Sequence, residues 1–127
     1  MPLVRISLMQ GKPAHFGKQV GEVVYQAMRS AIAIPAHDHF QVITEHDRTS
    51  LIYDPAFLDI ERTDDFILIQ ITLNEGRTLE AKQALYQEIA GRLHTALGIR
   101  TEDVFINLIE VKKENWSFGN GIAQYAQ

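Results

Sequence analysis

The stretch LVRISLMQGK at residues 3–12 recurs in altered form as LIQITLNEGR at residues 68–77. An offset of 65 positions aligns the two stretches without a gap, and the match continues well beyond them. The identical pairs are Leu3 with Leu68, Ile6 with Ile71, Leu8 with Leu73, Gly11 with Gly76, Ala31 with Ala96, Ile34 with Ile99, Asp38 with Asp103, Phe40 with Phe105 and Glu45 with Glu110. Self-similarity of this kind indicates two copies of one supersecondary unit.

Each copy has the pattern of a strand, a helix and a second strand. Aliphatic and β-branched runs predict the strands, and apolar residues at helical spacing predict the helices. Pro35 and Gly98 are the expected helix stops. The first copy predicts a strand over Pro2 to Leu8, a helix over about Ala14 to Ala33 and a strand over His39 to Glu45; the second predicts Phe66 to Leu73, Leu79 to Leu97 and Val104 to Val111.

A strand–helix–strand unit normally pairs its two strands in parallel through a right-handed crossover. Two such units predict an α/β fold in which a duplicated β-α-β unit forms a four-stranded sheet with both helices on one face. We expect a single domain over residues 1–127, with pseudo-repeats at about 2–46 and 67–111 and an aromatic tail at 114–127. No further long helix is predicted to cover the other sheet face, so we expect it to pack against other copies of the chain in a ring.

Composition narrows the classes of function. The 127 residues carry a net charge of -4, which argues against nucleic acid as a partner, because phosphate binding needs a basic surface. There is no cysteine, and no apolar run approaches the length of a membrane span. We expect a cytoplasmic protein without membrane contact. His37, His39 and His46 are a conceivable metal set, but their spacing is weak and we expect neither a metal nor a cofactor.

Three segments carry a family resemblance that covers nearly the whole chain. They are Met-Pro-Leu at 1–3, PAHDHFQV at 35–42 and NWSFGNG at 115–121. Together with the duplicated unit, they resemble the tautomerase superfamily, and within it the malonate semialdehyde decarboxylases. The resemblance implies the tautomerase fold, which macrophage migration inhibitory factor shares, a homotrimer, and catalysis by an amino-terminal proline after removal of Met1.

The resemblance also implies a set of site residues. The catalytic proline falls on Pro2, the acidic residue after the first helix on Asp38, and a carboxylate-binding arginine on Arg77. The family has two arginines here, whereas this chain has Asn74 and Arg77 in the segment NEGR, with one residue inserted. Asn74 is a further candidate for substrate binding. The aromatic wall of the family site falls on Trp116, Phe118 and Tyr125.

These residue types fit chemistry on small oxo acids. A free proline amine can act as base, acid or nucleophile, and Arg77 can bind a carboxylate. Decarboxylation of a 3-oxo acid, keto-enol tautomerisation of a 2-oxo acid and hydration of an unsaturated acid all stay open, as does a binding module without catalysis. Plainer readings also exist, since the repeat mates Asp103 and Lys12 give Asp38 a turn role and Arg77 a solvent-exposed role.

Overall fold

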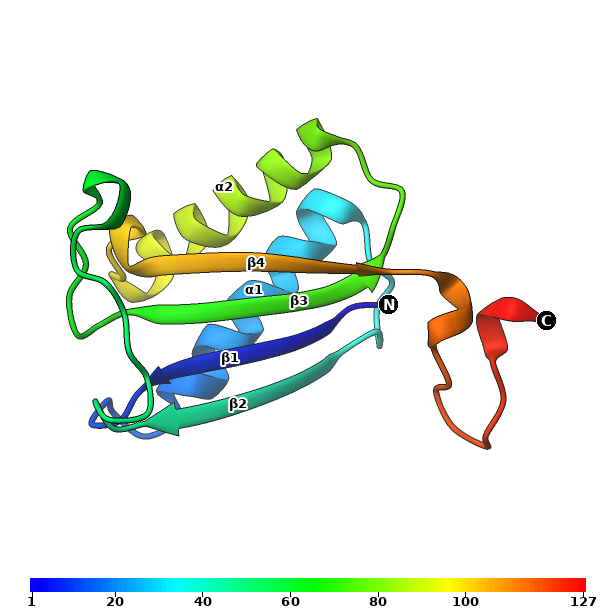
Figure 1. Ribbon diagram of the computed structural model, residues 1–127, viewed down its shortest axis with the longest axis horizontal. Coiled ribbons are helices and arrows are strands. Elements are labelled where there is room, and N and C mark those ends of the chain that lie inside the picture. Colours follow the sequence, from blue (N-terminus) through cyan, green and yellow to red (C-terminus); the bar gives the residue numbers. More distant parts are fainter.

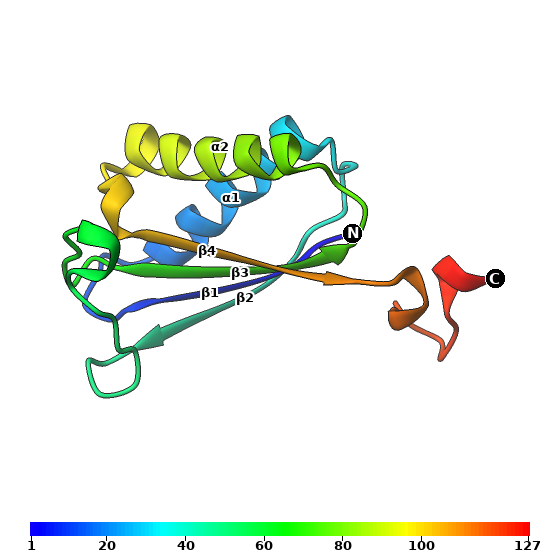
Figure 2. The same ribbon diagram turned by 45° about the horizontal axis from the view of Figure 1, so that its top comes forward.

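The computed structural model describes residues 1–127 and has the predicted α/β architecture (Figure 1). Its main elements are β1 (Leu3–Met9), α1 (Phe16–Ile32), β2 (Phe40–His46), β3 (Ile67–Asn74), α2 (Leu79–Leu97) and β4 (Val104–Val111). Both helices lie on one face of the four-stranded sheet, as the view in Figure 2 shows from the side. The predicted elements are confirmed, and their ends differ from the predicted ends by at most two residues.

The order of strands in the sheet is β2-β1-β3-β4. Within each repeat the strands pair in parallel, whereas the central pair, β1 with β3, is antiparallel. In a fully parallel sheet, as two β-α-β units suggest from the sequence, Asp38 before β2 and Arg77 after β3 would lie at opposite ends of the strands. That expectation is wrong, because the central pair is antiparallel. Because the two repeats meet head to tail, the starts of β1 and β2 lie at the same edge as the ends of β3 and β4.

The core lies between the sheet and the two helices. Alternate residues of each central strand point to the helices, as the period of two in a strand requires. These inward residues are fully or almost fully buried and meet one apolar stripe from each helix: Val4, Ile6 and Leu8 from β1, Ile67, Ile69, Ile71 and Leu73 from β3, Val20, Val24 and Met28 from α1, and Leu85, Ile89 and Leu93 from α2. Burying each such side chain stabilises the fold by about 1.5–3 kcal/mol.

Helix α1 approaches β2 closely because it presents glycine there. The Gln41 side chain donates a hydrogen bond of 2.8 Å to the carbonyl oxygen of Gly21. A Cβ atom at Gly21 would collide with the Gln41 side-chain oxygen, and one at Gly17 would lie 2.9 Å from the Ile43 side chain. The hydrogen bond at Gly21 and the close approach of Ile43 to Gly17 hold β2, the outermost strand on its side of the sheet, against the first helix.

The ends of α2 carry conventional caps. The Thr78 hydroxyl accepts a hydrogen bond of 3.2 Å from the Ala81 N–H at the first turn. Gly98 ends the helix in the left-handed conformation, with φ 68°, as its position in the sequence predicted. Neither α1 nor α2 has the combined length and apolar composition that a bilayer-crossing helix needs.

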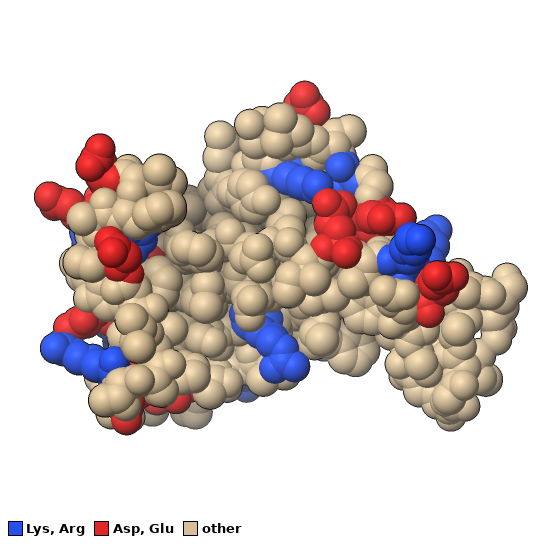
Figure 3. Space-filling model, in the orientation of Figure 1, with Lys and Arg blue, Asp and Glu red and all other residues tan.

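The sheet face opposite the helices is uncovered within one chain. Phe40, Val42, Phe105 and Ile109 are large apolar residues on it that are between 42% and 55% exposed. Figure 3 views this face, where most of the surface over the strands is uncharged; one basic side chain lies near the middle, and most other charged groups lie toward the ends. An apolar surface of this kind on a small protein is typical of an interaction face.

Candidate functional site

The residues that the sequence singled out lie close to one edge of the sheet, by which we mean the side where β1 and β2 begin and β3 and β4 end. Leu3 at the start of β1 pairs with Phe40 of β2 and with Thr72 near the end of β3. Asn74 at the end of β3 pairs with Val111 at the end of β4. The amino terminus, the turn before β2, the turn after β3 and the tail after β4 therefore meet at this edge, and Figure 1 shows the terminus beside the points where β3 and β4 end.

A cavity of about 240 Å³ lies at this edge. Its lining combines the amino terminus, the first residue of β2 and the start of the tail: Met1, Pro2, Leu3, Phe40, Trp116, Ser117 and Phe118. Pro2 is buried. The lining is mostly apolar, so a polar group bound here would be shielded from water, which strengthens electrostatic interactions.

Asp38 lies where it can act on the chain terminus. It follows His37, which has a left-handed φ of 71°, in the turn between α1 and β2. One carboxylate oxygen of Asp38 accepts a hydrogen bond from the ammonium group of Met1 and forms an ion pair with it. The other oxygen is buried and has no hydrogen-bond partner. A buried carboxylate oxygen without a protein partner is costly, and this oxygen is free to accept a further hydrogen bond.

The tail forms an aromatic wall over the cavity. Trp116 and Phe118 stack with ring centroids 5.4 Å apart, and Tyr125 meets the edge of Phe118 at 4.8 Å. The Gln124 side chain closes the tail on itself, since it accepts from the Phe118 N–H at 2.9 Å and donates to the Gly119 carbonyl at 2.8 Å. Tyr125 packs against Phe118 but does not line the cavity.

Asn74 fixes the wall to the sheet. Its side-chain oxygen accepts a hydrogen bond of 2.8 Å from the Trp116 indole nitrogen. The predicted substrate-binding residue therefore uses one acceptor position of its amide oxygen for Trp116, and its NH₂ group forms no hydrogen bond within the protein.

Arg77 lies in the turn after β3 and forms no ion pair. Its guanidinium donates to the Asn74 carbonyl oxygen at 3.2 Å, so it is held close to the end of β3. Glu110 anchors the same turn: the Lys82 ammonium donates to it at 2.6 Å, and this bond and the Gly76 N–H hold the pKa of the Glu110 carboxyl below its ordinary value. Arg77 does not line the cavity.

Sequence reasoning missed several residues of this site. Leu3, Phe40 and Ser117 line the cavity, and Gln124 shapes its wall. The signal for Phe40 was present, because strand alternation places it on the sheet face away from the helices. Of the histidines weighed as metal ligands, His39 stacks on Tyr25 with centroids 4.2 Å apart, and the His46 ring lies 3.4 Å from the Ser50 hydroxyl.

Residues 38–119 match a family model described as tautomerase enzyme. The chain is 45% identical to the probable tautomerase YusQ of Bacillus subtilis (strain 168), over 98% of both proteins. A crystal structure of a malonate semialdehyde decarboxylase inhibited by 3-bromopropiolate superposes with a TM-score of 0.90 at 35% identity, covering 97% of this chain and 93% of that one.

A more distant structure supports the fold alone. A fused 4-OT wild type symmetric trimer superposes with a TM-score of 0.77 at 22% identity, covering 98% of each chain. The family model and the curated relative both cover most of this sequence. The chain therefore belongs to the tautomerase superfamily, and its structure resembles malonate semialdehyde decarboxylase.

Proposed function

We propose that this protein is a cofactor-free enzyme that acts on small oxo acids through the amine of Pro2, with decarboxylation of malonate semialdehyde as its reaction. The observation that carries the proposal is that Pro2 lines an apolar cavity, while Asp38, which does not line it, binds the chain terminus next to Pro2. The likeness to the decarboxylase structure supports the choice of substrate.

Removal of Met1 is the step that would create the catalyst. While Met1 is present, the nitrogen of Pro2 is an amide and Asp38 binds the ammonium of Met1. Once Met1 is removed, the secondary amine of Pro2 becomes the chain terminus beside the same carboxylate. Asp38 would then orient this amine and stabilise its protonated form, because an opposite charge nearby favours the charged state.

The decarboxylation step needs a place for negative charge. As the bond between the carboxylate carbon and the adjacent carbon breaks, carbon dioxide leaves and the electron pair moves onto the aldehyde oxygen. Cationic Pro2 would donate its proton to that oxygen, and the resulting enol would ketonise to acetaldehyde. Arg77, in the turn after β3, would bind the substrate carboxylate before it leaves, and the wall of Trp116 and Phe118 would exclude water.

The second candidate is a tautomerase reaction on a 2-oxo acid enol, and the single arginine favours it. One guanidinium holds a carboxylate less firmly than two, which matters most for a reaction that must position the breaking bond. Neutral Pro2 would then act as base, and Arg77 would still bind the carboxylate. Hydration of an unsaturated acid would use the same groups, and a non-catalytic binding module would use the cavity alone.

We further propose that copies of the chain associate through the bare sheet face as a homotrimer. The exposed apolar residues on that face support this, and a structural neighbour is described as a trimer. Ile109→Asp would place a charge on this apolar face and so disfavour such an interface. Light scattering after size exclusion should then give a trimer mass for the unchanged protein and a monomer mass for the variant. The same mass for the two proteins would contradict the proposal.

The activity test compares the intact protein with Pro2→Ala on malonate semialdehyde, after mass spectrometry has established that Met1 is absent. A rate that exceeds the uncatalysed reaction and is lost in Pro2→Ala, with an unchanged circular dichroism spectrum, is the expected result. Equal rates for both proteins would contradict proline catalysis. Catalysis of a 2-oxo acid enol, without decarboxylation, would assign the tautomerase reaction instead.

A further inference from the structure

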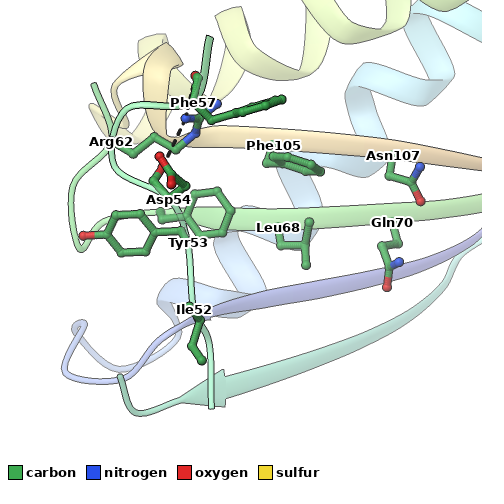
Figure 4. A pocket seen from close by; sticks show the side chains of 10 residues that line it. Ile52, Tyr53, Asp54, Phe57, Arg62, Leu68, Gln70, Phe105 and Asn107 are labelled. Carbon is green, nitrogen blue, oxygen red and sulfur yellow. Dashed lines mark hydrogen bonds between the residues drawn. The ribbon is translucent and has the colours of Figure 1, made fainter. Parts of the chain in front are cut away.

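The internal repeat relates two cavities, not only two sets of elements. A second cavity of about 470 Å³ lies at the opposite end of β3 from Pro2, beneath the segment that joins the repeats (Figure 4). Five of the seven residues that line the first cavity have mates at the offset of 65 that line the second. These pairs are Met1 with Phe66, Leu3 with Leu68, Phe40 with Phe105, Ser117 with Ile52 and Phe118 with Tyr53.

The antiparallel pairing of β1 with β3 explains this correspondence, since it places the start of the second repeat at the other edge of the sheet. The acidic residues correspond too. Asp103, the mate of Asp38, is fully buried and accepts from the N–H and the hydroxyl of Thr63, both at 2.7 Å. Where Asp38 binds the amino terminus, Asp103 binds a continuous chain. The lining of the second cavity therefore corresponds to that of the first, but no chain terminus lies there to supply an amine for proline chemistry.

The second cavity has a cation of its own. Lys12, the mate of Arg77, is paired with Asp65 and does not line this cavity. Arg62 lines it instead, and its Nη1 donates to the carbonyl oxygens of Asp54 at 3.2 Å, Phe57 at 3.0 Å and Ile60 at 3.3 Å. Arg62 forms no ion pair, and its Nη2 and Nε have no protein partner. The guanidinium is thus fixed in place by one nitrogen and keeps donors for a ligand.

The remaining lining is amphipathic. Figure 4 shows Leu68 and Phe105 on the strands between Arg62 at one end and the amides of Gln70 and Asn107 at the other. Neither amide side chain forms a hydrogen bond within the protein. Asp54 also lines the cavity, but its carboxylate accepts from the Ala56 N–H at 2.9 Å. An apolar floor with polar groups at both ends is the usual composition of a small-molecule site, and the volume falls in the usual range of roughly 300–1,000 Å³.

We propose that this second cavity is a non-catalytic binding site for a small carboxylate with an apolar body. Arg62 binds the carboxylate with its free donors, and the side chains of Phe57 and Phe105 cover the apolar part. Phe57, 58% exposed in the free protein, becomes buried against the ligand. The proposal does not depend on the reaction at Pro2, because the two cavities share no residue. It requires that the end of the bare sheet face around Phe105 stays open to solvent when copies of the chain associate.

The test uses 3-phenylpropanoate as the probe and 3-phenylpropanamide as its neutral counterpart, with two readouts. Amide chemical shifts of Leu68 and Phe105 report the second cavity. The fluorescence of Trp116, the only tryptophan of the chain, reports the first. We expect saturable shifts at Leu68 and Phe105 without a change in Trp116 fluorescence, and binding of the neutral amide at least about tenfold weaker, since a charge-assisted hydrogen bond is lost.

Variants assign the binding to this cavity. Arg62→Gln should weaken it at least about tenfold. Because Arg62 also holds the joining segment, Asn107→Asp provides a second test that leaves this segment intact and places a negative charge beside the ligand. Gln87→Glu, which makes the same charge change on the exposed face of α2, should have no effect. Pro2→Ala should bind as the unchanged protein does, whatever its activity.

Four results would overturn the proposal. The first is an absence of saturable shifts at Leu68 and Phe105, which a second copy covering the cavity would produce. The second is equal binding of the probe and its neutral amide, and the third is equal binding of the probe by Asn107→Asp and Gln87→Glu. The fourth is loss of binding in Pro2→Ala, which would place the probe in the first cavity.

Discussion

The Trp116 indole nitrogen donates a hydrogen bond of 2.8 Å to the side-chain oxygen of Asn74, and this bond joins the tail to the end of β3. Trp116 lines the cavity beside Pro2, whereas Asn74 does not. The residue that the family resemblance offered as a substrate ligand is therefore also a positioning residue for the aromatic wall. The rest of the wall depends on this anchor, because Phe118 stacks on Trp116 and Tyr125 packs on Phe118.

Replacing Asn74 by Ala should release Trp116 from the cavity. A hydrogen bond of this kind contributes about 0.5–1.5 kcal/mol, so we expect KM to rise by up to about tenfold and the Trp116 emission to shift to longer wavelength. Asn74→Asp keeps the acceptor oxygen and serves as the matched control, with an emission close to that of the unchanged protein. Identical emission from all three proteins would show that the bond does not hold the indole in place.

Arg77 can be tested against its own repeat mate. If Arg77 binds the substrate carboxylate, Arg77→Gln should raise KM by about ten- to a hundredfold, the usual contribution of a hydrogen bond to a charged group. Lys12→Gln removes the same charge at the other edge of the sheet, where Lys12 pairs with Asp65 at the surface. Steady-state kinetics should leave this control unchanged. A loss shared equally by both variants would indicate an effect of net charge, and no loss in either would remove Arg77 from the site.

Much of the fold could be predicted from the repeat, because local patterns determine it. The period of two around Ile69 and the helical spacing around Leu85 are visible in the sequence, and Gly98 is a local stop signal. The direction in which the two repeats meet has no local signal. Each strand–helix–strand unit satisfies its own pairing whichever way its partner runs, and only the antiparallel contact of β1 with β3 decides that Asp38 and Arg77 share an edge.

The same reason limits what could be predicted of the site. Pro2, Asp38 and Arg77 were named from the resemblance. Asp38 and Arg77 each have a repeat mate with the same local sequence signals. What separates Asp38 from Asp103 is the partner that tertiary structure supplies, a chain terminus in one case and Thr63 in the other. The second cavity had no signal in any single stretch, since its lining combines the joining segment with β3 and β4.

Gly21 offers a stability test with an internal control. A Cβ atom at Gly21 would displace the end of the Gln41 side chain and its hydrogen bond to the Gly21 carbonyl, so Gly21→Ala should lower the free energy of unfolding by about 0.5–1.5 kcal/mol in urea titrations. Gly91→Ala, in α2, meets nothing within 4 Å and should raise it by up to about 1 kcal/mol, because alanine favours helix. The double variant Gly21→Ala with Gln41→Ala should recover part of the loss. Equal effects of the two single changes would show that β2 does not press on α1.

Glu110 should make stability depend on acidic pH. Its bond to Lys82 and the Gly76 N–H hold its pKa in the folded protein below the ordinary value of 4.5. The folded state thus favours the ionised carboxyl, so its contribution is present above pH 4.5 and is lost as the pH falls through the lower, folded pKa. Urea titrations over this range should find Glu110→Gln less stable than the unchanged protein at neutral pH, with the difference shrinking as acid is added. A difference that stays constant with pH would mean that Glu110 contributes packing rather than charge, and that the turn carrying Arg77 does not depend on its ionised carboxylate.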